Sequence, residues 1–211
     1  MTNPSIQIDF DSIDFFETLR LAEQVASHVD IFGVSNACVK HNGIQIVQAL
    51  RRRFPDHKIL VDLQTMDSVE TEAAPFFSAG ANICSVMGLA GSKTIEEFVK
   101  FAGIHGASAQ VDLINAPDKV ACANMASALG AHFLSVGSQL NTESPFADLQ
   151  ELAQLGVHSK LSVSGQIDCR TTQQAADAGA AVLAIASSVF NTSSPQNSAL
   201  ELRNSMQLAV A

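Results

Sequence analysis

The segment AGANICSV (residues 79–86) contains the junction that decides the fold, because the chain repeats it four more times. In each copy a helix-like stretch ends at a glycine and a short apolar run begins. Glycine suits this position, since a helix commonly stops with a residue at positive φ, which glycine adopts without a Cβ penalty. The other copies are HGASAQVDLI (105–114), LGAHFLSV (129–136), LGVHSKLSV (155–163) and AGAAVLAI (178–185).

The spacing of these junctions indicates a repeated strand–helix unit. Gly80, Gly106, Gly130, Gly156 and Gly179 lie 26, 24, 26 and 23 residues apart. One strand and one helix of a tight barrel need about that much chain. Extending the interval toward the N-terminus adds three more apolar runs, so eight units are expected. The predicted strands are 6–10, 30–34, 58–62, 81–87, 108–114, 132–137, 160–164 and 181–186, and the predicted helices are 14–27, 43–54, 68–79, 92–105, 117–129, 146–155, 170–178 and 196–209.

Eight alternating units predict an α/β fold, a (β/α)8 TIM barrel, as a single domain over residues 1–211. Runs this apolar are typical of parallel strands that are buried on both faces. The chain is short for this barrel, which typically has ~250 residues, so its loops should be lean. A doubly wound open sheet is the alternative. Such a sheet usually has fewer strands and often a GxGxxG turn, and no such turn follows residues 6–10.

Composition and charge exclude several classes of protein. With 47% apolar and 16% charged residues the chain is not disordered, and its net charge of −9 disfavours nucleic acid as a partner. No apolar run approaches the ~20 residues of a membrane helix, and the N-terminal residues show no secretion signal. The four cysteines form no CxxC pair. We therefore expect buried free thiols and a cytoplasmic protein without a membrane partner.

Polar residues follow the predicted strands at the end where barrel enzymes carry their sites. Asp9, Asp62 and Asp112 come from three separate strands. Any one of them could merely cap a helix, but three carboxylates at one mouth repel each other unless a cation or a substrate balances them. A Mg²⁺ ion with oxygen ligands could do so. The further residues that we expect at this mouth, as contacts to substrate, are Asn36, Ser138, Gln139, Gly165, Gln166, Ser187 and Ser188.

Several segments carry a resemblance to a known family: IQIDF, DIFGVSNACVKHNG, ILVDLQTMD, QVDLIN and VSGQI with the closing AIASSVF. Over essentially the whole chain they resemble the 3-hexulose-6-phosphate synthase group of the orotidine monophosphate decarboxylase superfamily, which includes 3-keto-L-gulonate-6-phosphate decarboxylase. The resemblance implies carbon–carbon lyase chemistry through a Mg²⁺-stabilised enediolate of a phosphorylated ketose. It also implies a homodimer.

The resemblance also assigns roles to individual residues. Asp9 matches the aspartate of the first strand, and Asp62 matches the first aspartate of the family's Asp-x-Lys-x-x-Asp motif, a metal ligand. Asp67 matches the second motif aspartate, which reaches the partner subunit's site in a dimer. Asp112 matches an aspartate that contacts substrate.

At three positions the chain departs from the family pattern. Gln64 replaces the motif lysine, which would supply positive charge to the enediolate oxygens. Gly33 replaces a metal-binding glutamate, which impairs the expected Mg²⁺ site. Gly137 replaces a histidine that acts in proton transfer, and glycine cannot titrate.

The phosphate-binding region departs as well. Gly165 is kept, but Gln166 stands where the family has a second glycine, and Ala186-Ser187 replaces a Gly-Gly or Gly-Arg pair. Backbone N–H groups before a helix could still hold a phosphate.

Two hypotheses follow. In the first, the chain is a lyase-family protein that binds a small anionic, phosphorylated metabolite, with the usual Mg²⁺-enediolate activity altered or absent. The polar character of the replacements favours it. In the second, the chain is a non-catalytic paralogue that binds a ligand or a partner protein. The loss of the lysine, glutamate and histidine favours this alternative, and the sequence leaves both open.

Overall fold

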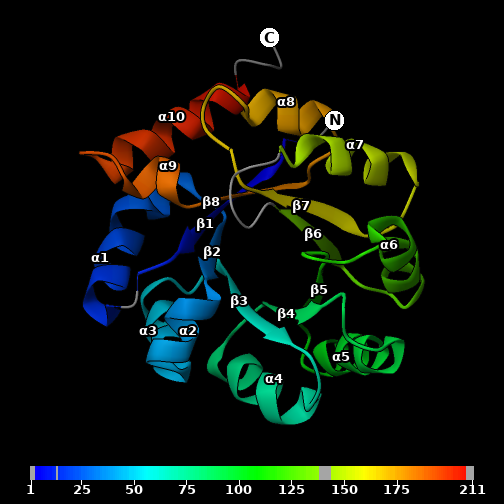
Figure 1. Cartoon of the computed structure of the whole chain (residues 1–211). Helices are drawn as coiled ribbons and strands as arrows, with labels where there is room; N and C mark the ends of the chain where they lie inside the picture. Colours follow the sequence, from blue (N-terminus) through cyan, green and yellow to red (C-terminus); the bar gives the residue numbers. More distant parts are fainter. Residues whose placement is uncertain (1–2, 13, 138–143, 208–211) are drawn as a thin grey trace.

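Eight parallel strands form a closed barrel in the computed structural model, which describes residues 3–12, 14–137 and 144–207 (Figure 1). Each strand pairs with the next along the chain, and β1 closes the barrel on β8. The predicted TIM barrel is thus confirmed, and the open doubly wound sheet is excluded. The strands are β1 (Ser5–Phe10), β2 (Ile31–Val34), β3 (Lys58–Thr65), β4 (Ile83–Met87), β5 (Ser108–Asp112), β6 (Phe133–Gly137), β7 (Lys160–Ser164) and β8 (Val182–Ile185).

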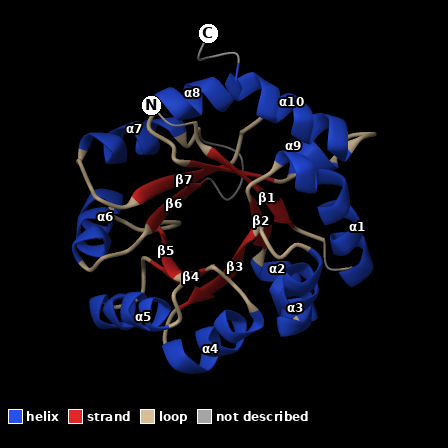
Figure 2. Ribbon diagram, turned by 180° about the vertical axis from the view of Figure 1, so that it is seen from behind, coloured by secondary structure: helices blue, strands red, loops and turns tan. Residues whose placement is uncertain are grey.

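The helices form a ring outside the barrel (Figure 2). Among the described residues, none of them is long and apolar enough to cross a membrane. Eight were predicted from the sequence: α1 (Phe15–Val25), α3 (Ile44–Arg53), α4 (Val69–Ala79), α5 (Ser92–Ile104), α6 (Lys119–Ala128), α7 (Phe146–Gln154), α8 (Thr172–Asp177) and α10 (Pro195–Gln207).

Two short helices were not predicted, and both follow a strand directly. In α2 (Asn36–Asn42) the first turn is capped by Ser35, whose hydroxyl accepts a hydrogen bond from the Cys38 N–H at 3.2 Å. The helix α9 (Ser187–Phe190) begins two residues after β8. Neither is long enough to show a helical period, which explains why both segments were interpreted as loops.

The glycines of the repeated junction have the conformation that the sequence predicted. All five have positive φ, from 64° at Gly106 to 106° at Gly80. At Gly80 the backbone N–H closes α4 on the carbonyls of Phe76 and Phe77, and the chain then turns toward β4. The regular spacing of these glycines thus reflects five successive helices, α4 to α8, that end at the same face of the barrel.

The strands are not uniformly apolar, and this corrects the sequence interpretation. Their outward residues, such as Ile8, Val61 and Leu134, are fully buried in the main core. Inside the barrel, a separate apolar cluster lies toward the N-terminal ends of the strands. Successive side chains on a strand alternate between its faces, so every second residue points into the barrel. Beyond the apolar cluster, toward the C-terminal ends of the strands, these inward residues are polar. The apolar cluster is Ile31, Leu60, Ile83, Phe133 and Val182, and the buried polar residues beyond it are Gln7, Ser85, Gln110 and Ser162.

The four cysteines are free thiols, as the sequence predicted. Cys38 and Cys84 are buried in the core, whereas Cys122 is partly buried and Cys169 is exposed. The prediction of burial is therefore wrong for Cys169, which lies in the loop after β7.

Candidate active site

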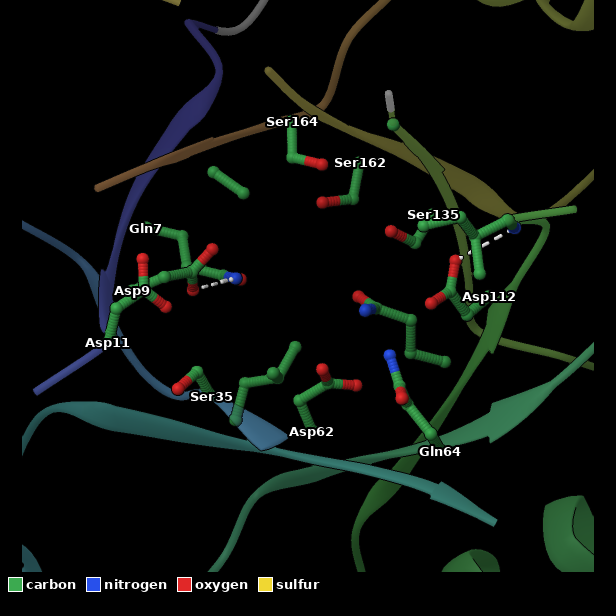
Figure 3. A pocket seen from close by; sticks show the side chains of 15 residues that line it. Gln7, Asp9, Asp11, Ser35, Asp62, Gln64, Asp112, Ser135, Ser162 and Ser164 are labelled. Atoms are coloured by element: carbon green, nitrogen blue, oxygen red, sulfur yellow. Dashed lines mark hydrogen bonds between the residues drawn. The ribbon is translucent and has the colours of Figure 1, made fainter. Parts of the chain in front are cut away.

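A cavity of about 180 Å³ lies inside the C-terminal end of the barrel and contains the three predicted carboxylates. Figure 3 shows Asp9, Asp62 and Asp112 on three sides of this central cavity. The predicted Gln64 also lines it, as does a fourth carboxylate, Asp11. Parallel strands bring these residues together because their C-terminal ends meet at the same rim. The other polar side chains of the lining are Gln7, Ser35, Gln110, Ser135, Ser162 and Ser164.

Asp9 has the most perturbed of these carboxyl groups. Its Oδ1 accepts a hydrogen bond from Gln7 Nε2 at 2.7 Å. Burial raises the pKa of Asp9 from 3.8 to about 7, against the lowering effect of the Gln7 bond, and the charges of Asp11 and Asp62 raise it further. Asp9 therefore changes protonation state near neutral pH and can donate or accept a proton there.

Asp62 is held by a hydrogen-bond chain at an irregular part of β3. Ser85 Oγ donates to Asp62 Oδ1 at 2.6 Å and accepts from the backbone N–H of Gln64 at 2.9 Å. Gln64 has a left-handed φ of 52°, and the pairing of β3 with β4 shifts in register here. Burial raises the pKa of Asp62, while the Ser85 bond lowers it. Asp62 and Gln64 stand two positions apart on β3, on the same face as Leu60, and both line the cavity.

Asp112 lies at the end of β5 and is only 9% exposed. The backbone N–H of Ile114 donates to its Oδ1 at 3.0 Å. Burial raises the pKa of Asp112 to about 6, the Ile114 bond lowers it, and the charge of Asp62 raises it. Two carboxyl groups of the cavity, Asp9 and Asp112, thus have pKa values close to neutrality, which is unusual enough to indicate a functional site.

A second cavity of about 310 Å³ adjoins the first and lies between the loops after β7 and β8. The two share Asp9, Asp11, Ser164 and Ala184 in their linings, so they lie side by side. The predicted substrate contacts that line the second cavity are Gly165, Gln166, Ser187 and Ser188.

Other predicted site residues lie elsewhere. Asn36 lines neither cavity, and its Nδ2 donates to the carbonyls of Asp62 and Leu63, both at 3.3 Å. It positions the end of β3. Asp67 is exposed in the loop after β3 and also lines neither cavity. Ser138 and Gln139 lie outside the described residues.

Sequence reasoning missed the deeper polar residues of the cavity. Gln7 and Gln110 each stand two positions before a site aspartate, Asp9 and Asp112, and so share its face of the strand. That period of two was visible in IQID and AQVD. The alternate residues of both segments are strongly apolar, and this masks the polar face.

The described side chains around the cavities do not fit a magnesium ion. In the part of the chain that the structure describes, no three His, Cys, Asp or Glu side chains are grouped to hold a metal. Asp62 is engaged with Ser85, and Asp9 with Gln7. A hard cation such as Mg²⁺ needs several oxygen ligands converging on one point.

Comparison with known proteins places this geometry in a family. A sequence model described as the "Orotidine 5'-phosphate decarboxylase / HUMPS family" matches residues 4–202. The 3-hexulose-6-phosphate synthase of Methylomonas aminofaciens is 41% identical over 200 residues, which cover 93% of this chain and 96% of that protein. The enzyme of the same name from Mycobacterium gastri is 32% identical over 201 residues, covering 94% and 97%.

A solved structure gives the same result in three dimensions. The crystal structure of a 3-hexulose-6-phosphate synthase superposes with a TM-score of 0.87 at 32% identity, and the match covers 96% of this chain and 99% of that one. Fold, chain length and family match agree over nearly the whole sequence. The chain therefore belongs to the orotidine 5'-phosphate decarboxylase / HUMPS family.

Proposed function

We propose that this protein binds a small, phosphorylated, hydroxyl-rich metabolite across the two adjoining cavities, and that the magnesium-dependent lyase reaction implied by its family is altered or absent. The single observation that carries the proposal is the described lining of the central cavity, which has four carboxylates and no lysine or arginine. The relatives named above are hexulose-phosphate synthases, which supports a sugar phosphate as the class of ligand.

The second cavity suits the phosphate group. Ser187 and Ser188 line it and begin α9, where backbone N–H groups have no acceptor within the helix. Such N–H groups, together with the Ser187 hydroxyl, are suitable donors to a phosphate. The Ser188 hydroxyl instead donates to the carbonyl of Ile167 at 2.9 Å. The central cavity suits the sugar, because carboxylates accept hydrogen bonds from hydroxyl groups. A ligand of this class would therefore lie with its phosphate toward the loops after β7 and β8.

The same lining argues against the family reaction. An enediolate carries negative charge on oxygen, and stabilising that charge requires a cation or well-placed donors. Here the donor from β3 is the neutral amide of Gln64, and four carboxyl groups surround the space. Removal of a single donor to a developing oxyanion typically costs about 10²–10³ in rate. We infer that turnover of the family substrates is lower by at least that factor.

The test combines a binding assay with an activity assay. Thermal shift with ribulose 5-phosphate, ribulose and inorganic phosphate, each with Mg²⁺ and with EDTA, should show stabilisation by ribulose 5-phosphate in both conditions. Ribulose 5-phosphate with formaldehyde and Mg²⁺ should give no condensation above about 1% of the rate of the Methylomonas aminofaciens enzyme run in parallel. Turnover comparable to that enzyme would refute the loss of activity, and no shift with ribulose 5-phosphate would refute the ligand.

The proposal includes the expected homodimer and cytoplasmic location. Exposure of Asp67 is compatible with a role at a partner subunit's site, and four unpaired thiols are compatible with a reducing compartment. Light scattering of the purified protein tests the dimer, since a monomer would remove the role given to Asp67.

A further inference from the structure

Two glycines of the central cavity each face a polar side chain on the neighbouring strand. In the strand pairing, Gly33 on β2 is opposite Asp9 on β1, and Gly137 on β6 is opposite Ser164 on β7. A Cβ atom placed on Gly33 would lie 1.8 Å from Asp9 Oδ1, and one placed on Gly137 would lie 2.2 Å from Ser164 Oγ. Atoms cannot approach so closely. A side chain at either glycine and the present position of its neighbour therefore exclude each other.

Space, and not backbone conformation, is what these positions need from glycine. Neither Gly33 nor Gly137 has positive φ, unlike the glycines that end the helices. Glycine inside a strand loses packing and conformational entropy, and it often marks a close approach of another group. Here the approaching groups are a carboxylate and a hydroxyl that point into the cavity (Figure 3).

We propose that Gly33 and Gly137 are specificity-determining positions, because their missing side chains admit Asp9 and Ser164 to the centre of the cavity, where these two groups bind hydroxyls of the ligand. The inference rests on the proposed function and deepens it, since it names the part of the ligand that the central cavity recognises. Asp9 provides a strong acceptor. Ser164 provides a hydroxyl at the boundary between the two cavities.

A neighbouring atom supports a hydroxyl-bearing ligand at this place. Gln7 is only 3% exposed and lines the central cavity beside Asp9. Its Nε2 donates to Asp9, while its Oε1 is buried without a hydrogen-bond partner among the described residues. Buried acceptors are nearly always paired, so this oxygen calls for a donor. A ligand hydroxyl that reached this place could donate its hydrogen to the Asp9 carboxylate or to Gln7 Oε1.

Double-mutant cycles test the inference by isothermal titration calorimetry with ribulose 5-phosphate, ribulose and ribitol as probes. Asp9→Ala and Gly33→Ala should each weaken binding at least tenfold. The double variant should bind no more weakly than Asp9→Ala alone, because the methyl group at position 33 then has no Asp9 carboxylate to displace. The cycle of Ser164→Ala with Gly137→Ala should behave in the same way.

Both glycine variants are expected to fold, because each new Cβ meets the far end of a side chain that can rotate. Circular dichroism checks this point. Gly103→Ala is the matched control, since its Cβ would meet no atom within 4 Å in α5, and it should bind as the wild type does.

The outcomes separate this inference from the proposed function. The inference would be overturned if the losses of affinity multiply in the double variants, or if the Gly33→Ala protein binds as tightly as the wild type. In either case the proposed function would still stand if the wild-type protein binds ribulose 5-phosphate. Binding of ribulose or ribitol but not of ribulose 5-phosphate, with non-additive cycles, would support the inference and overturn the phosphorylated ligand. Failure of the wild type to bind any probe would overturn both.

Discussion

Replacing Asp9 with asparagine should stabilise the protein, and the gain should grow with pH. Asparagine retains an oxygen that can accept the Gln7 hydrogen bond and fits the same space, but it carries no charge. The pKa of Asp9 is 3.8 when unperturbed and about 7 in the folded protein. Because the folded-state pKa is raised, the folded state binds the proton more tightly. Its stability is therefore greatest below pH 4 and is lost as the pH rises toward 7.

The magnitude follows from the shift. One pKa unit corresponds to about 1.4 kcal/mol, so ionised Asp9 destabilises the folded state by up to about 4 kcal/mol above pH 7. At pH 5 the same calculation gives about 1.7 kcal/mol, since the carboxyl group is then ionised only in the unfolded chain. The advantage of Asp9→Asn over the wild type should thus increase by about 2–3 kcal/mol between pH 5 and pH 8.

Urea unfolding followed by far-ultraviolet circular dichroism measures this difference, at one protein concentration and one ionic strength. Tryptophan fluorescence is not an option, because the chain has no Trp and no Tyr. Asp56→Asn, which removes a carboxylate from an exposed turn before β3, is the matched control for the loss of one charge. A stability difference between Asp9→Asn and the wild type that stays constant from pH 5 to pH 8 would refute the reasoning, since Asp9 would then not be desolvated in the folded state.

Three further predictions concern the scaffold and the support of the site. Ser85→Ala removes the donor to Asp62 and the acceptor of the Gln64 N–H. It should cost about 1–3 kcal/mol of stability in urea unfolding, and a loss below 0.5 kcal/mol would contradict this role. Arg203→Ala should cost about 1–2 kcal/mol and speed hydrogen exchange at the start of β1. Arg203 donates to Asp30, which in turn accepts from the Ile6 N–H. Leu134→Ala, at a fully buried position in the main core, should cost about 2–5 kcal/mol by the same unfolding assay. Because Leu134 points outward from the barrel, the relative affinities for ribulose 5-phosphate, ribulose and ribitol should not change.

Most of the fold could be predicted because its units are local. A glycine that ends a helix and an apolar run that begins a strand are adjacent in sequence, so Gly80 and its equivalents set the period. Convergence of Asp9, Asp62 and Asp112 could also be predicted, since parallel strands present their C-terminal ends at one rim. The short helix α2 could not, because its seven residues are too few to show a helical period.

The shape of the site depends on features that no single strand reveals. Gln64 has a left-handed φ at an irregular part of β3, which only the pairing of β3 with β4 makes visible. Asn36 looked like a substrate contact, yet its amide supports the β3 backbone. The exclusion between Gly33 and Asp9 depends on strand register and on side-chain direction, because the residues are 24 positions apart in sequence. Distances of this kind appear only after the barrel has closed.

The barrel also shows why the side chains of its cavity must be interpreted together. Each inward position has a limited volume, because the strands are about 4.8 Å apart and their inward residues share one interior. A glycine on one strand and a longer side chain on the next are therefore alternative ways to fill the same space. Gly33 does not leave the cavity short of a carboxylate, since Asp9 enters it from β1 and Asp11 from the loop that follows. By contrast, no side chain of the described lining supplies a positive charge in place of the motif lysine that Gln64 replaces. The described lining thus has four carboxyl groups and no lysine or arginine, which supports the proposal of a ligand that donates hydrogen bonds.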